Sequence, residues 1–499
     1  MNYSALLKAF MPEAILVFGA LLVLTHDLLG GRGRSHEYRA KIAAALGVVA
    51  VCIAGWMATT EFTLGATVDF LANDKLAFGA RLAILTLSGL TVLFIGGTSK
   101  VKNPAEHVAL MLFASSGFTL MAAAQNLLVA FLAFELSSLS LYILAGFDKT
   151  RRDSAEAGLK YFLFGGMAAA FMLFGFSLIY GLTGEISLAG IAAKLPQIPL
   201  SPLLIVAFVM IFVGFGYKAA AAPFHLWAPD AYQGAPATSA ALIASASKVA
   251  GFVLLARFLA ALLTKAGSIE IIGASKGWLG IFGALVIVSL LLGNIGALAQ
   301  SNVRRLLAYS AIGHAGVMLL AALVTGVGLE LPEVRNNLLL YYVFTYGIAS
   351  VGAFGVIAVV ENNGGCQQLS DLASLSKRSP LLGISLMVSI LSLAGIPPLA
   401  GFYAKFSVFE TLLRRSSIAS AQSLDNVIFW LVMLAIAMSA IALYYYLQIL
   451  KQALVVSPDK DQPTTPIRVP FMAAVSLLLC MITLIAVGVY PDLLMNLLK

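Results

Sequence analysis

The sequence predicts an all-α polytopic membrane protein with about 14 transmembrane helices. Of its 499 residues, 60% are hydrophobic and 11% are charged, with a mean hydropathy of +0.95, whereas about 25% of the residues are charged in a typical soluble domain. The hydrophobic residues form runs of roughly 20, the length that a helix needs to cross a bilayer. The formal net charge is +8, but the basic residues are scattered through short loops, which argues against nucleic acid as a partner.

About fourteen of these runs are long enough to be transmembrane spans. They lie at about 10–29, 41–60, 75–98, 105–124, 126–147, 156–182, 201–224, 236–263, 277–298, 303–325, 337–361, 380–413, 426–451 and 468–490. We expect helices 7 and 12 to be broken in mid-membrane. Pro223 interrupts the seventh run, and Gly395, Pro397 and Pro398 interrupt the twelfth, which is too long for one plain helix.

The order of the spans indicates an internal repeat. Spans four to eight and nine to thirteen form two sets of five, and the fourth span of each set is broken near a lysine, Lys218 or Lys405. Because five is odd, the two sets would enter the membrane from opposite sides, as in inverted-repeat transporters. We expect an N-terminal three-helix segment (1–104), two inverted five-helix repeats (105–263 and 277–451) and a C-terminal helix (468–499).

Positive charge alternates between successive loops. The basic loops hold Arg32, Arg34, Arg39, Lys41, Lys100, Lys102, Lys149, Arg151, Arg152, Arg304, Arg305, Lys377, Arg378, Lys451, Lys460 and Arg468. The other loops have fewer basic residues, and the one with Glu61, Asp69 and Asp74 is acidic. The positive-inside rule assigns the basic loops to the inner side of the membrane and both termini to the outer side.

Several titratable residues stand in the hydrophobic runs or at their breaks. They are Glu135, Lys218, Lys248, Lys405, His225 and His314. A charge in mid-membrane costs from about 2.5 to more than ~10 kcal/mol, so such residues are usually functional. At a helix rise of about 1.5 Å per residue, counting from the nearest polar boundaries places Glu135, Lys248, Lys405 and His314 at one depth.

A row of titratable groups at one depth suits lateral proton transfer between half-channels. Burial favours the neutral form of a lysine, whereas a nearby carboxylate favours the charged form. A lysine in such a row can therefore be switched between holding and donating a proton. Glu135 is the obvious partner for Lys218, because a buried carboxylate needs one.

These residues also have structural explanations. A buried lysine can pair with a partner subunit, and a histidine can bond a backbone carbonyl. Lys160, Arg81 and Arg257 lie within two turns of a span end, where snorkelling to the membrane surface is expected. We assign the stretch 118–134 to apolar packing and the tyrosine cluster 444–446 to an interface belt.

The sequence gives no sign of a cofactor or metal site. Cys52, Cys366 and Cys480 are far apart and have no CxxC spacing, so neither an iron–sulfur cluster nor a zinc site is predicted. Glycine-rich nucleotide-binding motifs are also missing from the sequence.

The stretch from Tyr217 to Pro236 resembles the signature of the antiporter-like subunits of respiratory complex I and of the multisubunit sodium/proton antiporters. The matching positions are Tyr217, Lys218, Pro223, Phe224, His225, Trp227, Pro229, Asp230, Tyr232, Gly234 and Pro236. Three further stretches agree with the same family, at 134–136, 302–310 and 395–406. The resemblance is strong over about residues 105–450.

Within this family, residues 377–405 look most like the N-type subunits of the proton-translocating NADH:quinone oxidoreductase. L-type subunits are longer and end in a lateral helix, and M-type subunits usually have a glutamate where Lys405 stands. The resemblance implies that Glu135 and Lys218 form a pair and that Lys248 and Lys405 continue a hydrophilic axis. It also implies that His225 and His314 bridge these groups.

The resemblance implies a proton-translocating subunit that holds no cofactor itself. NADH, FMN, iron–sulfur clusters and quinone would be bound by partner subunits. The expected neighbours are an M-type antiporter-like subunit on one side, small membrane subunits on the other, and membrane lipids. The expected location is the inner (plasma) membrane of a bacterium, with both termini in the periplasm.

Two other functions use the same features. A subunit of a multisubunit sodium/proton antiporter would contain similar buried groups, although the match at 377–405 disfavours it. An inert assembly scaffold would not need several charges at one depth.

The loop charges predict the orientation of the chain. A reporter that is active only in the cytoplasm, fused after Lys499, should give no signal, because both termini are expected to face the periplasm. The same reporter inserted in the basic loop at 149–152 should be active. A strong signal from the fusion at Lys499 would mean that the span count is wrong by one.

Overall fold

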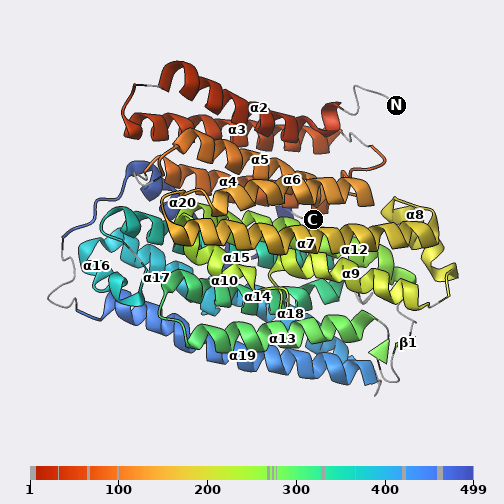
Figure 1. Cartoon of the computed structure of the whole chain (residues 1–499). Coiled ribbons are helices and arrows are strands. Elements are labelled where there is room, and N and C mark those ends of the chain that lie inside the picture. The colour runs from red at the N-terminus through yellow and green to blue at the C-terminus, as the bar shows by residue number, and fades with distance from the viewer. Residues whose placement is uncertain are drawn as a thin grey trace.

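The computed structural model describes residues 7–497 except 32, 65–67, 98–100, 200, 267–269, 272–274, 277, 327–331, 366, 419–422 and 458–464. The described residues form a bundle of long helices (Figure 1). Thirteen helices among them are long and apolar enough to cross a membrane. The remaining expected span, the twelfth, is divided into two shorter helices. The prediction of an all-helical, multi-pass membrane protein is therefore confirmed.

The chain begins with three long helices, of which the first two lie at one edge of the bundle (Figure 1, red). They are α2 (Met11–His26), followed by the π-helical turn η1 (Asp27–Gly31), then α3 (His36–Leu64) and α4 (Lys75–Ile95). Asp74 directly precedes α4 as its N-cap, and its carboxylate accepts a hydrogen bond from the backbone N–H of Ala77, as expected at a helix N-terminus.

The first set of five spans follows. It consists of α5 (Pro104–Ala123), α6 (Leu127–Ala145), α7 (Arg152–Thr183), the broken seventh span α9 (Pro202–Ala219) with α10 (Trp227–Gly234), and α11 (Ala237–Ala244) with α12 (Ala246–Ala266). The short elements α8 (Leu188–Lys194) and η2 (Leu195–Gln197) connect α7 to α9.

The second set starts after two very short antiparallel strands, β1 (Glu270–Ile271) and β2 (Ser275–Lys276). It consists of α13 (Trp278–Leu298), α14 (Val303–Gly326), α15 (Pro332–Asn362), the broken twelfth span α17 (Pro380–Ala394) with α18 (Ala400–Ile418), and α19 (Ser423–Leu454). Between α15 and α17 lie η3 (Leu369–Leu372) and α16 (Leu375–Arg378), and the chain continues with α20 (Phe471–Val489) and α21 (Asp492–Leu497).

Equivalent helices of the two sets have equivalent neighbours. α5 packs on α6 and α7 on α9, just as α13 packs on α14 and α15 on α17. Pro202 and Pro380 each begin the first half of a broken span, at the first helical position where the missing N–H of proline has no cost. This correspondence supports the proposed division into two repeats.

The breaks lie close to where the prolines predict them. α9 ends at Ala219, before Pro223, because Ala220 adopts the left-handed conformation with φ of 55°. α17 ends where Gly395 has φ of 84°, a conformation that glycine adopts without steric cost. A third break at Ser245 separates α11 from α12. Sequence reasoning missed it, because no proline or glycine marks the position.

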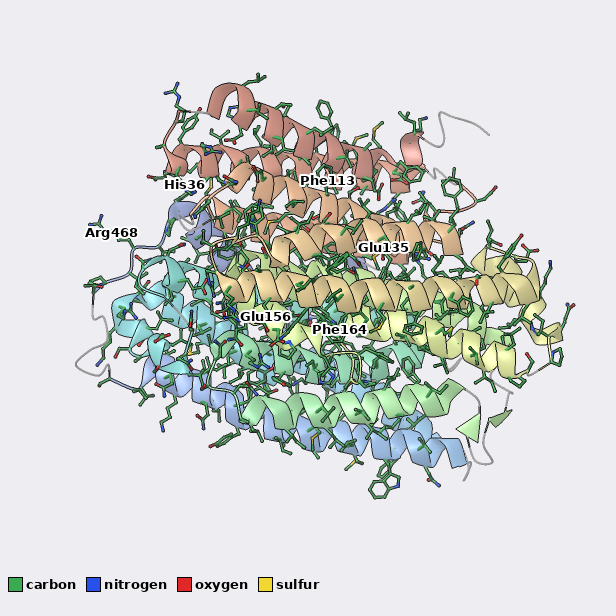
Figure 2. All side chains as sticks on the ribbon, viewed as in Figure 1. His36, Phe113, Glu135, Glu156, Phe164 and Arg468 are labelled. Carbon is green, nitrogen blue, oxygen red and sulfur yellow. The ribbon has the colours of Figure 1, made fainter. Side chains whose placement is uncertain are left out.

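Loops with basic residues gather at one end of the bundle. We call this end the basic face, defined by residues 101–103, 146–151, 299–302 and α16; it lies on the left in Figure 1, and His36 and Arg468 lie on the same side in Figure 2. The opposite face carries α8 and β1. Arg32, Lys100 and Lys460, which contributed to the predicted orientation, lie outside the described residues.

Arg81 is buried inside the N-terminal segment, so the expectation that it snorkels to the surface is wrong. Only 3% of the residue is exposed. Its guanidinium lies 3.0 Å from Glu13 Oε1 and 3.0 Å from Glu61 Oε2. Because breaking a buried ion pair leaves an uncompensated charge, this cluster fixes α2, α3 and α4 to one another.

Arg257 joins the N-terminal segment to the first five-helix set. It donates two hydrogen bonds to the Asp74 carboxylate, at 2.8 and 2.6 Å, and one to the Ala122 carbonyl at 2.7 Å. Burial by itself raises the pKa of the Asp74 carboxyl, but the hydrogen bonds and charge of Arg257 outweigh it and hold that pKa below its usual value.

The change Asp74→Asn should therefore destabilise the protein in a pH-dependent way. Asparagine can still cap α4, so the loss is that of the charge pair, on the order of 1 kcal/mol or less for a half-exposed pair. A depressed pKa in the folded state stabilises the fold at pH values above the ordinary pKa of aspartate, and this contribution disappears as the pH falls through the lowered pKa. Thermal unfolding of the detergent-solubilised protein should thus distinguish Asp74→Asn from the parent at pH 7.

The same difference should shrink steadily in acid. Asp69→Asn, at an exposed position of the same connection, is the matched control and should leave the unfolding temperature unchanged at every pH. Equal unfolding temperatures for Asp74→Asn and the parent at pH 7 would contradict the role assigned to the pair.

Candidate functional site

Lys218 lies in the last turn of α9, next to the first break, and is buried. Its ammonium donates hydrogen bonds to the hydroxyls of Ser137 at 2.9 Å and Ser138 at 3.1 Å, both on α6. The rings of Phe134 and Phe118 lie 4.8 and 5.5 Å from Nζ, within the range of a cation–π interaction. Two hydroxyls and two aromatic faces thus hold this amine.

Glu135 stands one turn before Ser138 on α6, near the centre of the bundle in Figure 2. It is partly buried, and its Oε1 atom has no hydrogen-bond partner among the described residues. It lies close enough to Lys218 for their charges to interact. However, the structure gives no direct ion pair between them within the described chain, because the serines take the ammonium. The expected pair is therefore an indirect one.

Lys248 lies at the start of α12, just after the third break. Its ammonium donates to the carbonyl of Ala219, the last residue of α9, at 3.1 Å and to the carbonyl of Ala311 on α14 at 2.8 Å. The ring of Tyr346 lies 5.6 Å from Nζ. Because the last carbonyls of a helix have no partner within the helix, Lys248 supplies one at the first break.

His314 follows Ala311 by one turn on α14. Its Nδ1 is 3.0 Å from the hydroxyl of Tyr342 on α15, and its Nε2 is 3.0 Å from the hydroxyl of Tyr446 on α19. It also lies near the carbonyl of Leu393 at the end of α17. The imidazole therefore connects α14 with the second break.

Lys405 lies in the second turn of α18 and folds back over the break. Its ammonium donates to the carbonyls of Leu393 at 3.0 Å and Ala394 at 3.2 Å, the last two residues of α17. A Cβ atom at Gly395 would lie 3.1 Å from Lys405 Cδ. Gly395 thus allows both the left-handed turn and the close approach of the lysine.

The two breaks are therefore built alike. In each, the final carbonyls of the first half-helix accept hydrogen bonds from a buried lysine, Lys248 at the first break and Lys405 at the second. The C-terminus of a helix carries partial negative charge, which favours a cation there. No carboxylate within the described chain forms an ion pair with either lysine.

The structure joins five of the six predicted site residues into one row. The row runs through Glu135, Lys218, Lys248, His314 and Lys405. Backbone carbonyls connect successive residues of the row. The carbonyl of Ala219, the residue after Lys218, accepts a hydrogen bond from Lys248, and so does the carbonyl of Ala311, one turn before His314. The carbonyl of Leu393 accepts a hydrogen bond from Lys405 and lies near His314.

His225 is placed differently. It is buried in the segment that follows the first break, and its Nδ1 has no hydrogen-bond partner among the described residues. No hydrogen bond given by the structure links it to the five-residue row, so its bridging role stays a prediction.

Several residues of the site were assigned otherwise from the sequence. Phe118 and Phe134 were read as apolar packing, but their rings face the Lys218 ammonium. The interface belt predicted at 444–446 is wrong for two of its tyrosines, because Tyr445 and Tyr446 are buried and only Tyr444 is exposed. Buried residues recur every three or four positions along α19, but this periodicity is visible only in the structure, because the sequence of the helix is apolar on nearly all faces.

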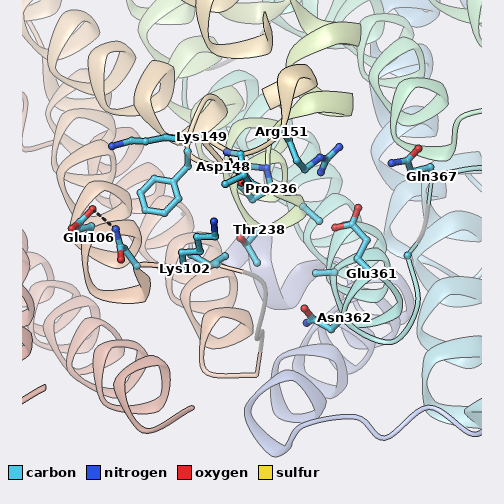
Figure 3. A pocket seen from close by; sticks show the side chains of 17 residues that line it. Lys102, Glu106, Asp148, Lys149, Arg151, Pro236, Thr238, Glu361, Asn362 and Gln367 are labelled. Carbon is cyan, nitrogen blue, oxygen red and sulfur yellow. Dashed lines mark hydrogen bonds between the residues drawn. The ribbon is translucent and has the colours of Figure 1, made fainter. Parts of the chain in front are cut away.

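A second buried histidine, His107 on α5, lies close to the basic face. Its Nε2 is 3.3 Å from the hydroxyls of Thr238 and Ser239 on α11. Thr238 also lines a cavity of about 490 Å³, in which Figure 3 shows it among Lys102, Asp148 and Glu361. The sequence analysis did not single out His107, which lies one turn inside a span.

Asp230 on α10 lies in a charged cluster at the same end of the bundle. It accepts hydrogen bonds from Lys160 on α7 at 2.7 Å and from Arg305 on α14 at 2.5 Å. These two cationic partners offset the cost of burying the carboxylate. The cluster ties the segment after the first break to α7 and α14.

The described residues contain no group of three or more histidine, cysteine or acidic side chains that could hold a metal ion. Cys52 is exposed and Cys480 buried, whereas Cys366 lies outside the described residues.

Comparison with known proteins identifies the family. The family model described as "NADH:quinone oxidoreductase/Mrp antiporter, TM" matches residues 124–428, which include both breaks and the whole row. A subunit N of NADH-quinone oxidoreductase from Acidobacterium capsulatum is 45% identical, over 100% of this chain and 99% of its own length.

Solved structures agree. A chain of respiratory complex I from Thermus thermophilus is 30% identical, with a TM-score of 0.77 and coverage of 97% of this chain and 98% of that one. A chain of the Mrp complex from Dietzia is 19% identical, with a TM-score of 0.79 and coverage of 98% and 96%, which shows a shared fold. The chain belongs to the antiporter-like membrane subunits of NADH:quinone oxidoreductase, as a member of the subunit N family.

Proposed function

We propose that this chain translocates protons as a membrane subunit of NADH:quinone oxidoreductase, and that the row from Glu135 to Lys405 is its relay. One observation carries the proposal: buried amines and an imidazole follow one another across the bundle, joined through the carbonyls of two broken helices. In a redox-linked complex, a subunit that translocates protons without a cofactor of its own needs such a path.

The chemistry of the row suits transfer in either direction. The ammonium groups of Lys248 and Lys405 are held by neutral carbonyls. Loss of a proton therefore gives a neutral amine and leaves no buried carboxylate without a counter-charge. His314 has a hydroxyl at each ring nitrogen and can accept a proton at one nitrogen while it releases one from the other. Each transfer moves one proton from an N–H or O–H group to a neighbouring nitrogen or oxygen.

The relay needs a drive from outside the chain. Moving one charge against the membrane potential costs about 2.3 kcal/mol per 100 mV, and an isolated path would only leak. We infer that neighbouring subunits bias the Glu135 and Lys218 end of the row, because a change of state requires a partner that binds the two states differently. Lys218 is the suitable switch, since two hydroxyls rather than a carboxylate hold its ammonium.

The setting follows from the same proposal. NADH, FMN, iron–sulfur clusters and quinone would be bound by partner subunits. An M-type antiporter-like subunit would lie on one side, small membrane subunits on the other, and lipids around the rest. The chain would lie in a bacterial inner membrane with the basic face toward the cytoplasm and both termini in the periplasm. His225 would extend the relay beyond the first break.

Sodium/proton exchange is the alternative function. The family model covers both groups of proteins, but the Mrp relative supports only the fold at 19% identity, whereas relatives at 37–45% identity over almost the whole chain are subunits N. We therefore favour proton translocation, and a dependence of pumping on sodium in the purified complex would reverse that choice.

Glu135 and Lys218 should behave as one unit. Glu135→Gln and Lys218→Met should each lower proton pumping by about tenfold or more, as expected when a positioned proton carrier is lost. The double variant should cost much less than the two singles combined, because both remove the same coupled unit. The measurement is pumping per NADH in vesicles that contain the whole complex.

The exposed lysine of α3, Lys41→Met, is the matched control and should pump like the parent, and native gels should show equal assembly of all variants. Strictly additive losses in fully assembled complexes would leave two independent sites in place of the coupled one.

Lys405→Ala should slow pumping while NADH oxidation by artificial acceptors persists, because the lysine binds the second break and no redox group. It should also destabilise the chain around the second break, since the carbonyls of Leu393 and Ala394 lose their hydrogen-bond donor. Lys451→Ala, at the exposed end of α19, controls for loss of a lysine. An unchanged proton-to-electron ratio in vesicles would assign Lys405 a structural role only.

A further inference from the structure

Three tyrosines from three helices gather beside Lys218. Tyr142 on α6, Tyr161 on α7 and Tyr217 on α9 are all buried. Tyr142 and Tyr161 meet edge to face at 5.0 Å, and Tyr161 and Tyr217 are 6.0 Å apart between ring centroids. None of them belongs to the proposed relay, although Tyr217 directly precedes Lys218.

The hydroxyls of Tyr142 and Tyr217 converge at Gly165 on α7. A Cβ atom at Gly165 would lie 1.9 Å from the Tyr142 hydroxyl and 2.5 Å from the Tyr217 hydroxyl. Both oxygens therefore occupy the space that any side chain at this position would need. The Tyr217 hydroxyl donates to the carbonyl of Tyr161 at 3.1 Å, so its position is fixed.

Tyr142 lies on α6, the helix whose Ser137 and Ser138 bind Lys218. Tyr142 follows Ser138 by one turn of α6, and its hydroxyl meets that of Tyr217 at Gly165. It nevertheless completes a hydrogen bond with no described residue. A buried hydroxyl without a partner is less favourable than a phenylalanine of the same shape. Packing therefore gives no reason for tyrosine here, whereas proton transfer to Ser138 does.

The cluster stands on the basic-face side of Lys218. α6 runs toward that face, and Tyr142 is nearer its end than Ser138, whose hydroxyl binds the ammonium. Toward the face, Tyr161 stacks on Trp227 with ring centroids 4.2 Å apart. Trp227 belongs to α10, whose Asp230 lies one turn further and binds Lys160 and Arg305. The aromatic stack therefore separates the tyrosine hydroxyls from a charged, partly exposed cluster.

We propose that Tyr142 and Tyr217 form a gate through which a proton from water at the basic face reaches Lys218, with Ser138 as the last step. The inference rests on the proposed function and adds residues to it. A proton from a hydronium ion binds the Tyr217 oxygen, and the hydroxyl proton of Tyr217 turns from the Tyr161 carbonyl and passes to the Tyr142 oxygen. Tyr142 then releases its own hydroxyl proton to Ser138, and Ser138 passes its own proton to the neutral amine of Lys218. One O–H bond forms and one breaks at each hydroxyl, an N–H bond forms at Lys218, and all three hydroxyls end neutral.

The gate predicts that single oxygen atoms matter. Tyr142→Phe removes one unbonded hydroxyl and keeps the ring, so the complex should assemble normally. Its initial rate of proton pumping in vesicles should fall about tenfold or more. Loss of a positioned proton donor usually costs ~10²–10⁴-fold, and we expect a smaller loss here because water can partly replace the hydroxyl. The solvent deuterium isotope effect on pumping should rise, since proton transfer at the gate becomes limiting.

Two further variants and a control sharpen the test. Tyr217→Phe should also slow pumping. Gly165→Ala should do so as well, because the added methyl group displaces both hydroxyls although neither tyrosine is substituted. Tyr180→Phe removes a hydroxyl from an exposed tyrosine of α7 and should have no effect on the rate or the isotope effect.

The outcomes separate this inference from the function on which it rests. Wild-type pumping and an unchanged isotope effect in assembled Tyr142→Phe and Tyr217→Phe complexes would overturn the gate, while a defect in Lys218→Met would leave the relay standing. Normal pumping in Lys218→Met as well would overturn both. Slow pumping in Tyr142→Phe with an unchanged isotope effect would also count against the gate, because it would point to altered packing.

Discussion

The buried row depends on one kind of contact, a lysine ammonium bound to the last carbonyls of a broken helix. A helix that stops inside a membrane leaves carbonyls that water cannot reach, and a lysine in hydrocarbon lacks acceptors. Lys248 at the end of α9 and Lys405 at the end of α17 satisfy both needs at once. The left-handed residues Ala220 and Gly395 turn the chain so that these contacts can form.

The two halves of the bundle repeat this arrangement, and the first half contains one further buried lysine that is held differently. Lys248 and Lys405 are fixed by carbonyls, whereas serine hydroxyls and phenylalanine rings hold Lys218. Hydroxyls can both accept and donate, so the surroundings of Lys218 suit a group that gains and loses a proton, with Glu135 near by. The lysine with this different environment lies at α6 and α9, where the tyrosine cluster also lies.

The N-terminal segment contains the contrasting case. Arg81 is as deeply buried as the relay lysines, but two carboxylates, Glu13 and Glu61, hold it at 3.0 Å. A guanidinium remains protonated in proteins, and with two acidic partners it can only be a fixed part of the frame. Burial of a charge alone therefore does not indicate proton transport. The hydrogen-bond acceptors around the charge distinguish a structural ion pair from a group that can transfer protons.

Composition and spacing along the chain determined the membrane class, the order of spans and the two broken helices, because apolar length and proline or glycine act locally. The same reasoning found Glu135, Lys218, Lys248, His314 and Lys405, since a charge in an apolar run is visible without a partner. Only the tertiary structure decided what surrounds them. The break at Ser245 has no local signal. The hydrogen bonds of Lys218 to Ser137 and Ser138 join helices far apart in the sequence, and the burial of Arg81 and Tyr446 likewise depends on helices distant in sequence. Contacts between helices fix these features, and no spacing within one helix encodes them.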